Sequence, residues 1–318
     1  MAAVEEVGAI LNLVFMGTPA FAVPTLEALI QKGHQVKLVV TQPDKPKGRG
    51  QKLAMSPVKE KALELGLPVA QSVSLKTPEF HDLIAEQKAD LLVVVAFRIL
   101  PATLFPLAKF GAVNIHGSLL PKYRGAAPIQ WAVANGETET GVTIFRLDSE
   151  IDHGGILAQV KTPIGPDETA GELFERLSGI GRDLLLKTLG DLEANRITPL
   201  EQDHSKSSPA PKLKKEDGLL DWTLPATALH NRIRAFNPYP VCYSTEAESG
   251  RILRIHRTQV VSGDSIEPGI LRVDSQIPVV GTGDGSLRLI EVQWEGKPRI
   301  SGRDFINGLR GEEALRFS

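Results

Sequence analysis

Asn114 and His116, an asparagine and a histidine two residues apart, are the side chains best placed in this sequence to carry chemistry. They lie at the end of a short apolar run, and the two-residue period of a β-strand puts both side chains on one face. A carboxamide donor beside a titratable ring at the end of a parallel strand is typical of sites in α/β enzymes. The alternative is a buried pair that satisfies local backbone groups, and these two residues alone do not separate the two interpretations.

A second polar cluster covers residues 148–153, with three carboxylates and His153, and two glycines follow it. A carboxylate on such a glycine-hinged loop, here Asp152, can reach a histidine on a neighbouring strand. The alternative is a solvated acidic turn. His116, Asp152 and His153 could also be read as metal ligands, but no second ligand pair at helical spacing supports that reading.

The elements that must position these residues follow an α/β pattern. Short apolar runs predict buried parallel strands, and apolar residues at helical spacing predict the helices between them. Strand 90–96 is the most hydrophobic and is therefore predicted to be central. The turn at Gly17 lacks G-x-G-x-x-G, which argues against a nicotinamide dehydrogenase. The predicted strands are 11–16, 36–41, 90–96, 112–116, 140–147 and 159–163, and the predicted helices are 21–32, 56–66, 77–87, 126–135 and 169–195.

The α/β pattern gives way to short alternating strands after a polar segment rich in Pro, Ser and Lys that begins near residue 204. We predict a catalytic domain at 1–204, a linker at 205–220 and a second domain at 221–318. Short alternating strands with Gly and Asp turns predict a small β-barrel of the oligonucleotide-binding type there. Residues 205–318 carry 16 Lys and Arg against 14 Asp and Glu, which permits contact with nucleic acid without demanding it. The predicted barrel strands are 241–246, 251–261, 269–273, 278–283 and 286–293.

Composition narrows the class of protein. The 318 residues are 42% hydrophobic and 23% charged, which is typical of a soluble protein of two domains. The net charge of −2 means that a nucleic acid must be met by a local patch. One cysteine, Cys242, excludes an internal disulfide framework. The N-terminus has no basic signal region, and no apolar run reaches the ~20 residues of a membrane helix. We expect a cytoplasmic protein.

The segment 42–52 is unusually basic, with four Lys and Arg against one Asp, and it contains two prolines and two glycines. This composition predicts an exposed, mobile loop without regular structure. Lys and Arg on an adaptable loop suit the phosphate backbone of a nucleic acid. A solvated loop is the alternative.

Together these motifs resemble the folate-dependent formyltransferases. The run Asn114-x-His116-x-Ser118-Leu119-Leu120-Pro121-x-x-Arg124-Gly125 is similar to the signature of that family. The basic segment Thr41–Gly50 and the later Ile233–Pro238 narrow the resemblance to its methionyl-tRNA formyltransferases. The resemblance extends from about Leu13 to near Arg310.

The resemblance implies a Rossmann-like N-terminal domain with a mostly parallel sheet and a C-terminal OB-like β-barrel domain. The reaction would move a formyl group from 10-formyltetrahydrofolate, a co-substrate, to the α-amine of initiator methionyl-tRNA. The family's catalytic residues fall on Asn114, His116 and Asp152, no metal is implied, and we expect a monomer. The implied folate contacts are Ser118, Leu119, Leu120 and Pro121, together with Phe97, Arg98 and Ile99 beside the pterin pocket. The basic residues assigned to tRNA are Lys45, Lys47, Arg49, Lys52, Lys212, Lys214, Lys215, Arg232 and Arg234.

Two positions depart from the family pattern. Where the family has Ala-Tyr-Gly-x-Ile-Leu-Pro, this chain has one residue fewer, and Arg98 replaces the small residues. Gly155 stands where an acidic residue is common. Neither departure touches Asn114, His116 or Asp152.

The chemistry expected of these residues is direct transfer. Asn114 and protonated His116 would stabilise the oxyanion that develops on the formyl group, and Asp152 would orient His116. Cys242 lies in the other domain, so no acyl-enzyme is expected. One rival is a formyltransferase acting on an amino sugar or a glycinamide ribonucleotide, which needs neither the basic loop nor the barrel. Another is a non-catalytic RNA-binding protein, which would not need the catalytic residues.

Overall fold

A computed structural model of the chain describes residues 10–47, 52–261, 266–309 and 315–318. These residues fall into two compact units, which we describe separately. Unit 1 comprises Met1–Gly125, Gly141–Thr162 and Phe174–Pro209, and unit 2 comprises Ala126–Thr140, Pro163–Leu173 and Ala210–Ser318.

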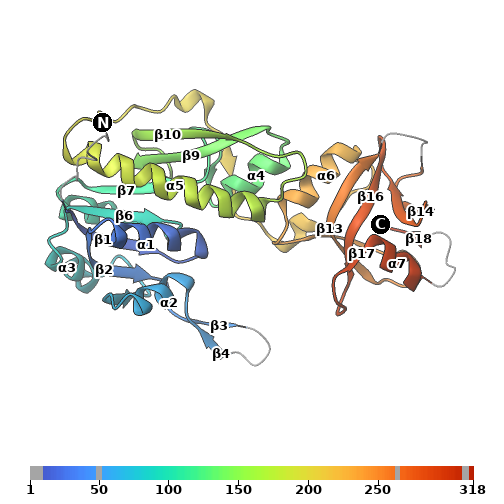
Figure 1. The fold of residues 1–318 in the computed structure, drawn as a ribbon, viewed down its shortest axis with the longest axis horizontal. Helices are drawn as coiled ribbons and strands as arrows, with labels where there is room; N and C mark the ends of the chain where they lie inside the picture. Colours follow the sequence, from blue (N-terminus) through green and yellow to red (C-terminus); the bar gives the residue numbers. More distant parts are fainter. Residues whose placement is uncertain (1–9, 48–51, 262–265, 310–314) are drawn as a thin grey trace, which may run out of the picture. The chain divides into compact units, whose positions relative to one another are not determined.

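A seven-stranded, mostly parallel sheet is built in the order β10-β9-β7-β6-β1-β2-β5 (Figure 1). β1 pairs in parallel with β2 and β6, and β6 pairs in parallel with β7, whereas β7 and β9 are antiparallel. The prediction that strand 90–96 is central is confirmed, because β6 is the fourth of the seven strands. The strands are β1 (Asn12–Gly17), β2 (Gln35–Thr41), β5 (Val69–Gln71), β6 (Leu91–Val95), β7 (Ala112–His116), β9 (Glu139–Arg146) and β10 (Ile156–Pro163).

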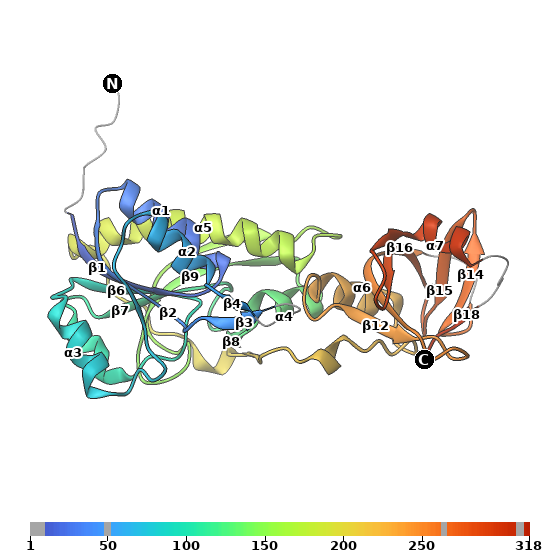
Figure 2. The ribbon, with the colours of Figure 1, turned by 90° about the horizontal axis from the view of Figure 1, so that it is seen from below.

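Helices cover both faces of this sheet, because its central strands are apolar on both sides. Figure 2 shows α1, α2 and α5 on one face and α3 on the other. Alternate residues of β1 divide between the faces, so Val14 and Met16 pack with Phe80 and Ile84 of α3 in one buried cluster. The helices are α1 (Val23–Gln31), α2 (Pro57–Glu64), α3 (Pro78–Glu86), α4 (Pro128–Ala134) and α5 (Ala170–Glu193), and a 3-10 helix, η2, covers Ala102–Leu107.

Two of these helices begin as their sequences predict. The Ser56 hydroxyl accepts a hydrogen bond from the amide of Lys59 at 3.1 Å, and Thr77 accepts one from the amide of Phe80 at 3.3 Å. A proline follows each cap, where its missing N–H costs nothing.

The prediction that segment 42–52 has no regular structure holds for 42–44 but is wrong for 45–47 and for Lys52. Strands β3 (Lys45–Lys47) and β4 (Lys52–Ala54) pair antiparallel, with Lys45 opposite Ala54. A ladder of two strands has free edges, so Pro46 is tolerated although it lacks an N–H. The residues between these strands, 48–51, lie outside the described part of the chain.

Unit 2 contains an antiparallel sheet with the order β12-β13-β16-β15-β14-β18, and β17 pairs with β16. A bridge between Glu246 and Phe317 links the end of β12 to the end of β18, so the C-terminal residues lie between the two edges. This antiparallel half-barrel confirms the fold class predicted for the C-terminal part of the chain. The strands are β12 (Cys242–Thr245), β13 (Ile252–Val261), β14 (Ile270–Asp274), β15 (Ile277–Gly281), β16 (Ser286–Trp294), β17 (Ile300–Ser301) and β18 (Leu315–Arg316), with helices α6 (Ala226–Ala235) and α7 (Gly302–Gly308).

Unit 2 also takes in 126–140 and 163–173, which the sequence analysis assigned to the N-terminal domain. The reason is packing: Trp131 of α4 meets Phe236 edge-on, with ring centroids 6.0 Å apart. The predicted linker is partly ordered, since β11 (Pro209–Ala210) pairs with β8 (Arg124–Gly125), and two 3-10 helices, η3 (His204–Lys206) and η4 (Lys215–Gly218), flank it. None of the helices in the described ranges is long and apolar enough to cross a membrane.

Candidate active site

Strand β7 carries Asn114 and His116 at its C-terminal end, between a parallel neighbour and an antiparallel one. Their spacing of two puts both side chains on the same face of the sheet. Asn114 is half-buried, and its carboxamide makes no hydrogen bond within the part of the chain that the structure describes. An amide held at a strand end with an unused donor is free to meet a ligand.

The ring of His116 is 5% exposed and is held by the backbone. Its Nε2 lies 2.8 Å from the carbonyl oxygen of Tyr123. A carbonyl can only accept, so Nε2 carries the hydrogen and the neutral ring keeps its lone pair on Nδ1. Phe145 meets the ring edge-on at 6.3 Å between centroids. Nδ1 is thus the ring nitrogen that is available for proton transfer.

Asp152 comes from the loop after β9 and faces that nitrogen. Its Oδ2 lies 3.6 Å from Nδ1 of His116, which is too far for a hydrogen bond but close enough to stabilise a positive charge on the ring when Nδ1 is protonated. The amide of Gly125 donates to the same oxygen at 2.8 Å. The backbone of Asp152 has φ +50°, a left-handed conformation that is costly for a residue with a side chain.

The loop at 118–121 is organised by Thr143 of the neighbouring strand β9. The Thr143 hydroxyl donates to the carbonyl of Ser118 at 2.7 Å and accepts from the amide of Leu120 at 3.1 Å. The hydroxyl of Ser118 donates to the carbonyl of Lys122 at 2.7 Å, and Ser118 is fully buried. Leu120 is also buried, so only Leu119 and Pro121 offer side-chain surface.

The residues expected beside the pterin pocket follow β6. Arg98 donates to the carbonyls of Ser72 and Val73 at 2.6 and 2.8 Å, and its guanidinium lies 5.3 Å from the centre of the Phe97 ring. Burial lowers the pKa of this guanidinium from its ordinary value. Arg98 therefore ties two loops together, while Ile99 is exposed.

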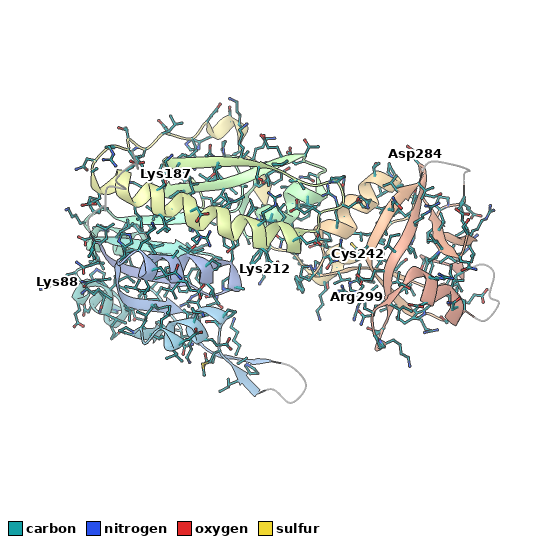
Figure 3. All side chains as sticks on the ribbon, in the orientation of Figure 1. Lys88, Lys187, Lys212, Cys242, Asp284 and Arg299 are labelled. Atoms are coloured by element: carbon teal, nitrogen blue, oxygen red, sulfur yellow. The ribbon has the colours of Figure 1, made fainter. Side chains whose placement is uncertain are left out.

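The basic residues assigned to tRNA divide into two groups. Lys45 and Lys212 have exposed side chains, and Lys212 is labelled in Figure 3. Lys214 and Lys215 are exposed as well. Lys47 and Lys52 stand opposite each other in the backbone ladder of β3 and β4, and Arg49 lies outside the described residues.

Arg232 and Arg234 of α6 are instead engaged within unit 2. Arg234 is 6% exposed and donates to the carbonyls of Gly165 and Glu168, both at 3.1 Å. Arg232 donates to the carbonyl of Asp217 from two nitrogens, at 2.9 and 2.6 Å. The expectation that Arg234 presents its charge to tRNA therefore needs correction, because burial leaves no surface for a phosphate.

Sequence reasoning missed three residues that support the site. The carbonyl of Tyr123 lies against the His116 ring, the hydroxyl of Thr143 bonds the loop at 118–121, and the carboxamide of Gln202 donates to the carbonyls of Asp152 and Gly154. A backbone carbonyl has no sequence signature, and an isolated threonine or glutamine has little more. Among the described residues, no group of three or more His, Cys, Asp and Glu side chains is arranged to hold a metal ion.

Comparisons with known proteins match both halves of the chain. A family model described as "Formyl transferase" matches residues 10–189, and "Formyl transferase, C-terminal domain" matches residues 212–310. The chain is 48% identical over 303 residues to the methionyl-tRNA formyltransferase of Solibacter usitatus strain Ellin6076, covering 94% of this chain and 96% of that protein. It is 47% identical over 309 residues to that of Geobacter sulfurreducens, covering 96% of each. The chain belongs to the methionyl-tRNA formyltransferases.

Solved structures of other proteins show the same fold. WlaRD, a sugar 3N-formyltransferase, superposes with a TM-score of 0.66 at 21% identity, over 92% of this methionyl-tRNA formyltransferase and 100% of that chain. HypX from Aquifex aeolicus, solved with tetrahydrofolic acid, gives a TM-score of 0.66 at 16% identity, over 96% of this chain and 48% of that one. At these identities the likeness concerns the fold alone.

Proposed function

We propose that this enzyme transfers the formyl group of 10-formyltetrahydrofolate to the α-amine of methionine on initiator tRNA. The observation that carries the proposal is the convergence of Asn114, His116 and Asp152, with 3.6 Å between Nδ1 of His116 and the Asp152 carboxylate. The two relatives at 47–48% identity, both methionyl-tRNA formyltransferases, support the substrate.

The proposed chemistry is direct transfer. The amine attacks the formyl carbon, and the Asn114 amide donates to the oxygen on which negative charge develops. His116, fixed by Tyr123, takes the amine proton on Nδ1, and the Asp152 carboxylate stabilises the resulting imidazolium. The new N–C bond forms as the bond from the formyl carbon to the folate nitrogen breaks, and the proton passes to that departing nitrogen or to water.

The exposed side chains indicate which surfaces would bind the folate and the tRNA. Leu119 and Pro121, with Phe97 and Ile99, supply apolar surface for the folate. The exposed lysines supply charge for the tRNA backbone, and a flexible ammonium suits a phosphate contact that does not read sequence. These lysines are Lys45, Lys212, Lys214 and Lys215.

The single cysteine, which is buried, supports a reducing, cytosolic compartment.

The test pairs a substrate comparison with one substitution. Given 10-formyltetrahydrofolate, the protein should formylate methionyl initiator tRNA and leave an amino sugar and glycinamide ribonucleotide unmodified. Asn114→Ala should lower kcat by about a hundredfold to a thousandfold, the usual effect of losing one oxyanion donor. Asn307→Ala, an exposed asparagine on α7 in unit 2, is the matched control and should keep wild-type turnover.

Two results would contradict the proposal. One is formylation of a small amine in preference to the aminoacyl-tRNA. The other is near-normal turnover by folded Asn114→Ala protein, whose folding is checked by circular dichroism.

A further inference from the structure

Gln202 lies beneath the loop that carries Asp152, although the two residues are 50 positions apart in the chain. Gln202 is 4% exposed. Its Nε2 donates to the carbonyl of Asp152 at 3.0 Å and to the carbonyl of Gly154 at 2.8 Å. Both amide hydrogens of this side chain are therefore committed to the backbone of a single loop.

Arg124 determines which way the Gln202 amide points. Its Nη2 and Nε lie 2.6 and 3.3 Å from Oε1 of Gln202. A guanidinium only donates, so the oxygen must face Arg124 and the NH2 group must face the two carbonyls. The opposite orientation would set donor against donor and acceptor against acceptor. Arg124 thus aims the Gln202 donors at the Asp152 loop.

A second set of contacts holds the flanks of the same loop. Nη2 of Arg124 also donates to Nδ1 of His204 at 2.8 Å, and the His204 ring stacks on His153 at 4.0 Å with 4° between the planes. His153 lies 2.7 Å from the carboxylate of Asp148 through its Nδ1. His153 and Gly154, which follow Asp152, are therefore tied directly to the 202–204 segment, and Asp148, which precedes it, is tied to His153.

The conformation of Asp152 explains why such contacts are needed. With φ +50° its backbone occupies a region that side-chain-bearing residues rarely adopt, and this conformation persists only where surrounding contacts impose it. Its Oδ2 is fixed by the amide of Gly125, and its carbonyl is fixed by Gln202. Gly154 adds a further constraint, because a Cβ there would collide with the carbonyl of Arg146.

We infer that Gln202 is a positioning residue for the formyl transfer, which holds Asp152 where its carboxylate faces Nδ1 of His116. The inference rests on the proposed function, in which that carboxylate stabilises the protonated ring. Gln202 touches neither His116 nor the reacting atoms. Its effect on the reaction must therefore pass through Asp152.

A double-mutant cycle tests this route. Gln202→Glu keeps the length of the side chain and its acceptor for Arg124, but it loses the donors and turns an oxygen towards two carbonyls. We expect kcat to fall by about tenfold to a hundredfold, the scale of a catalytic group displaced by up to 1 Å. KM for folate and for tRNA should change by less than about twofold. In an Asp152→Asn background the same substitution should cost less than about twofold, because residues that act through one group are not additive.

The outcomes separate the two proposals. If Asp152→Asn alone keeps wild-type turnover, the role proposed for Asp152 in the transfer fails, and the inference fails with it, although the proposed reaction still stands. If Asp152→Asn is impaired but Gln202→Glu is not, or if the two losses multiply, the inference alone is wrong. If Gln202 had only a structural role, Gln202→Glu would lower turnover by the same factor in the wild type and in Asp152→Asn, and the two losses would multiply.

Controls cover folding and the substitution itself. Gln293→Glu makes the same change at a half-buried glutamine of unit 2 that also donates to a carbonyl, that of Lys297 at 2.7 Å, and it should leave kcat unchanged. If the buried charge of Gln202→Glu prevents folding, Gln202→Met enters the same cycle. Methionine has similar length and no donor, so the same non-additive loss is expected, and an additive one would overturn the inference.

Discussion

The imidazole of His116 is oriented by a backbone carbonyl and not by the nearby carboxylate. The bond from Nε2 to the Tyr123 carbonyl is 2.8 Å, whereas Asp152 is 3.6 Å from Nδ1. Asp152 is therefore placed to respond to charge on the ring and does not need to hold the ring in place. This division separates the tautomer, set by Tyr123, from the electrostatics, set by Asp152.

Thr143 has a comparable organising role for the loop that follows His116. Its buried hydroxyl serves the carbonyl of Ser118, the amide of Leu120 and the carboxamide of Gln159, the last at 2.8 Å. Gln159 also donates to the carbonyl of Leu120 at 2.8 Å. One hydroxyl thus satisfies two buried backbone groups, the carbonyl of Ser118 and the amide of Leu120, and also accepts from the exposed Gln159.

We predict that Thr143→Val destabilises the enzyme by about 2 kcal/mol, because valine leaves buried donors and acceptors without partners. Urea denaturation followed by circular dichroism measures the change. KM for the folate should rise as well, since the loop supplies Leu119 and Pro121. Thr143→Ser keeps the hydroxyl and should retain most of the stability. Equal stability of the valine and serine variants would show that the hydroxyl is unimportant.

At the scale of elements, the long helix α5 begins with a reciprocal capping box. The amide of Glu172 donates to the Thr169 hydroxyl at 3.3 Å, and the Glu172 carboxylate accepts from the Thr169 amide at 2.8 Å. Arg257 of β13 pairs with the same carboxylate. The hydrogen bond from the Thr169 amide has the largest effect and the pairing with Arg257 the next largest, and together they lower the pKa of Glu172 to about 2. A negative charge also suits the N-terminus of a helix.

We predict that Glu172→Gln removes an acid-sensitive part of the stability. The folded-state pKa, about 2, lies below the ordinary glutamate pKa of 4.5, so the charge stabilises the folded state above about pH 4.5. That contribution is lost as the pH falls towards 2. Melting temperatures measured from pH 7 to pH 2 should therefore converge for the wild type and Glu172→Gln at the acid end. Parallel curves over this range would contradict the assignment.

At the scale of the whole molecule, the tryptophans and the cysteine, which can serve as spectroscopic and chemical probes of unfolding, lie in unit 2. All three tryptophans, Trp131, Trp222 and Trp294, belong to that unit. The single cysteine, Cys242, lies there too, on β12 (Figure 3). It is fully buried, and this burial raises the pKa of its thiol to about 12.

We predict that Cys242 does not react with a thiol reagent in the native enzyme at pH 8, because the thiol is buried and stays protonated. Labelling should begin only as unit 2 unfolds. With increasing urea, the midpoint of labelling should coincide with the midpoint of the tryptophan fluorescence change. Rapid labelling without denaturant would show that β12 is accessible in the native state.

Local patterns were sufficient for much of this fold. The apolar run that ends in Asn114 and His116 predicts β7, and the central position of β6 follows from its hydrophobicity. Ser56 and Thr77, each before a proline, predict two helix starts. These features depend on neighbours within a few residues, and their physical causes, such as side-chain period and capping, are visible in a single stretch of chain.

The sequence by itself therefore determined the α/β sheet, the barrel strands and the residue types at the site. Only the tertiary structure decided how these residues are used. It brought Gln202 to a loop 50 residues earlier, buried Arg234 and paired the ends of the basic segment as β3 and β4. Each of these outcomes depends on contacts between segments far apart in the chain, and neither a period nor a turn signal encodes which donor will meet which carbonyl.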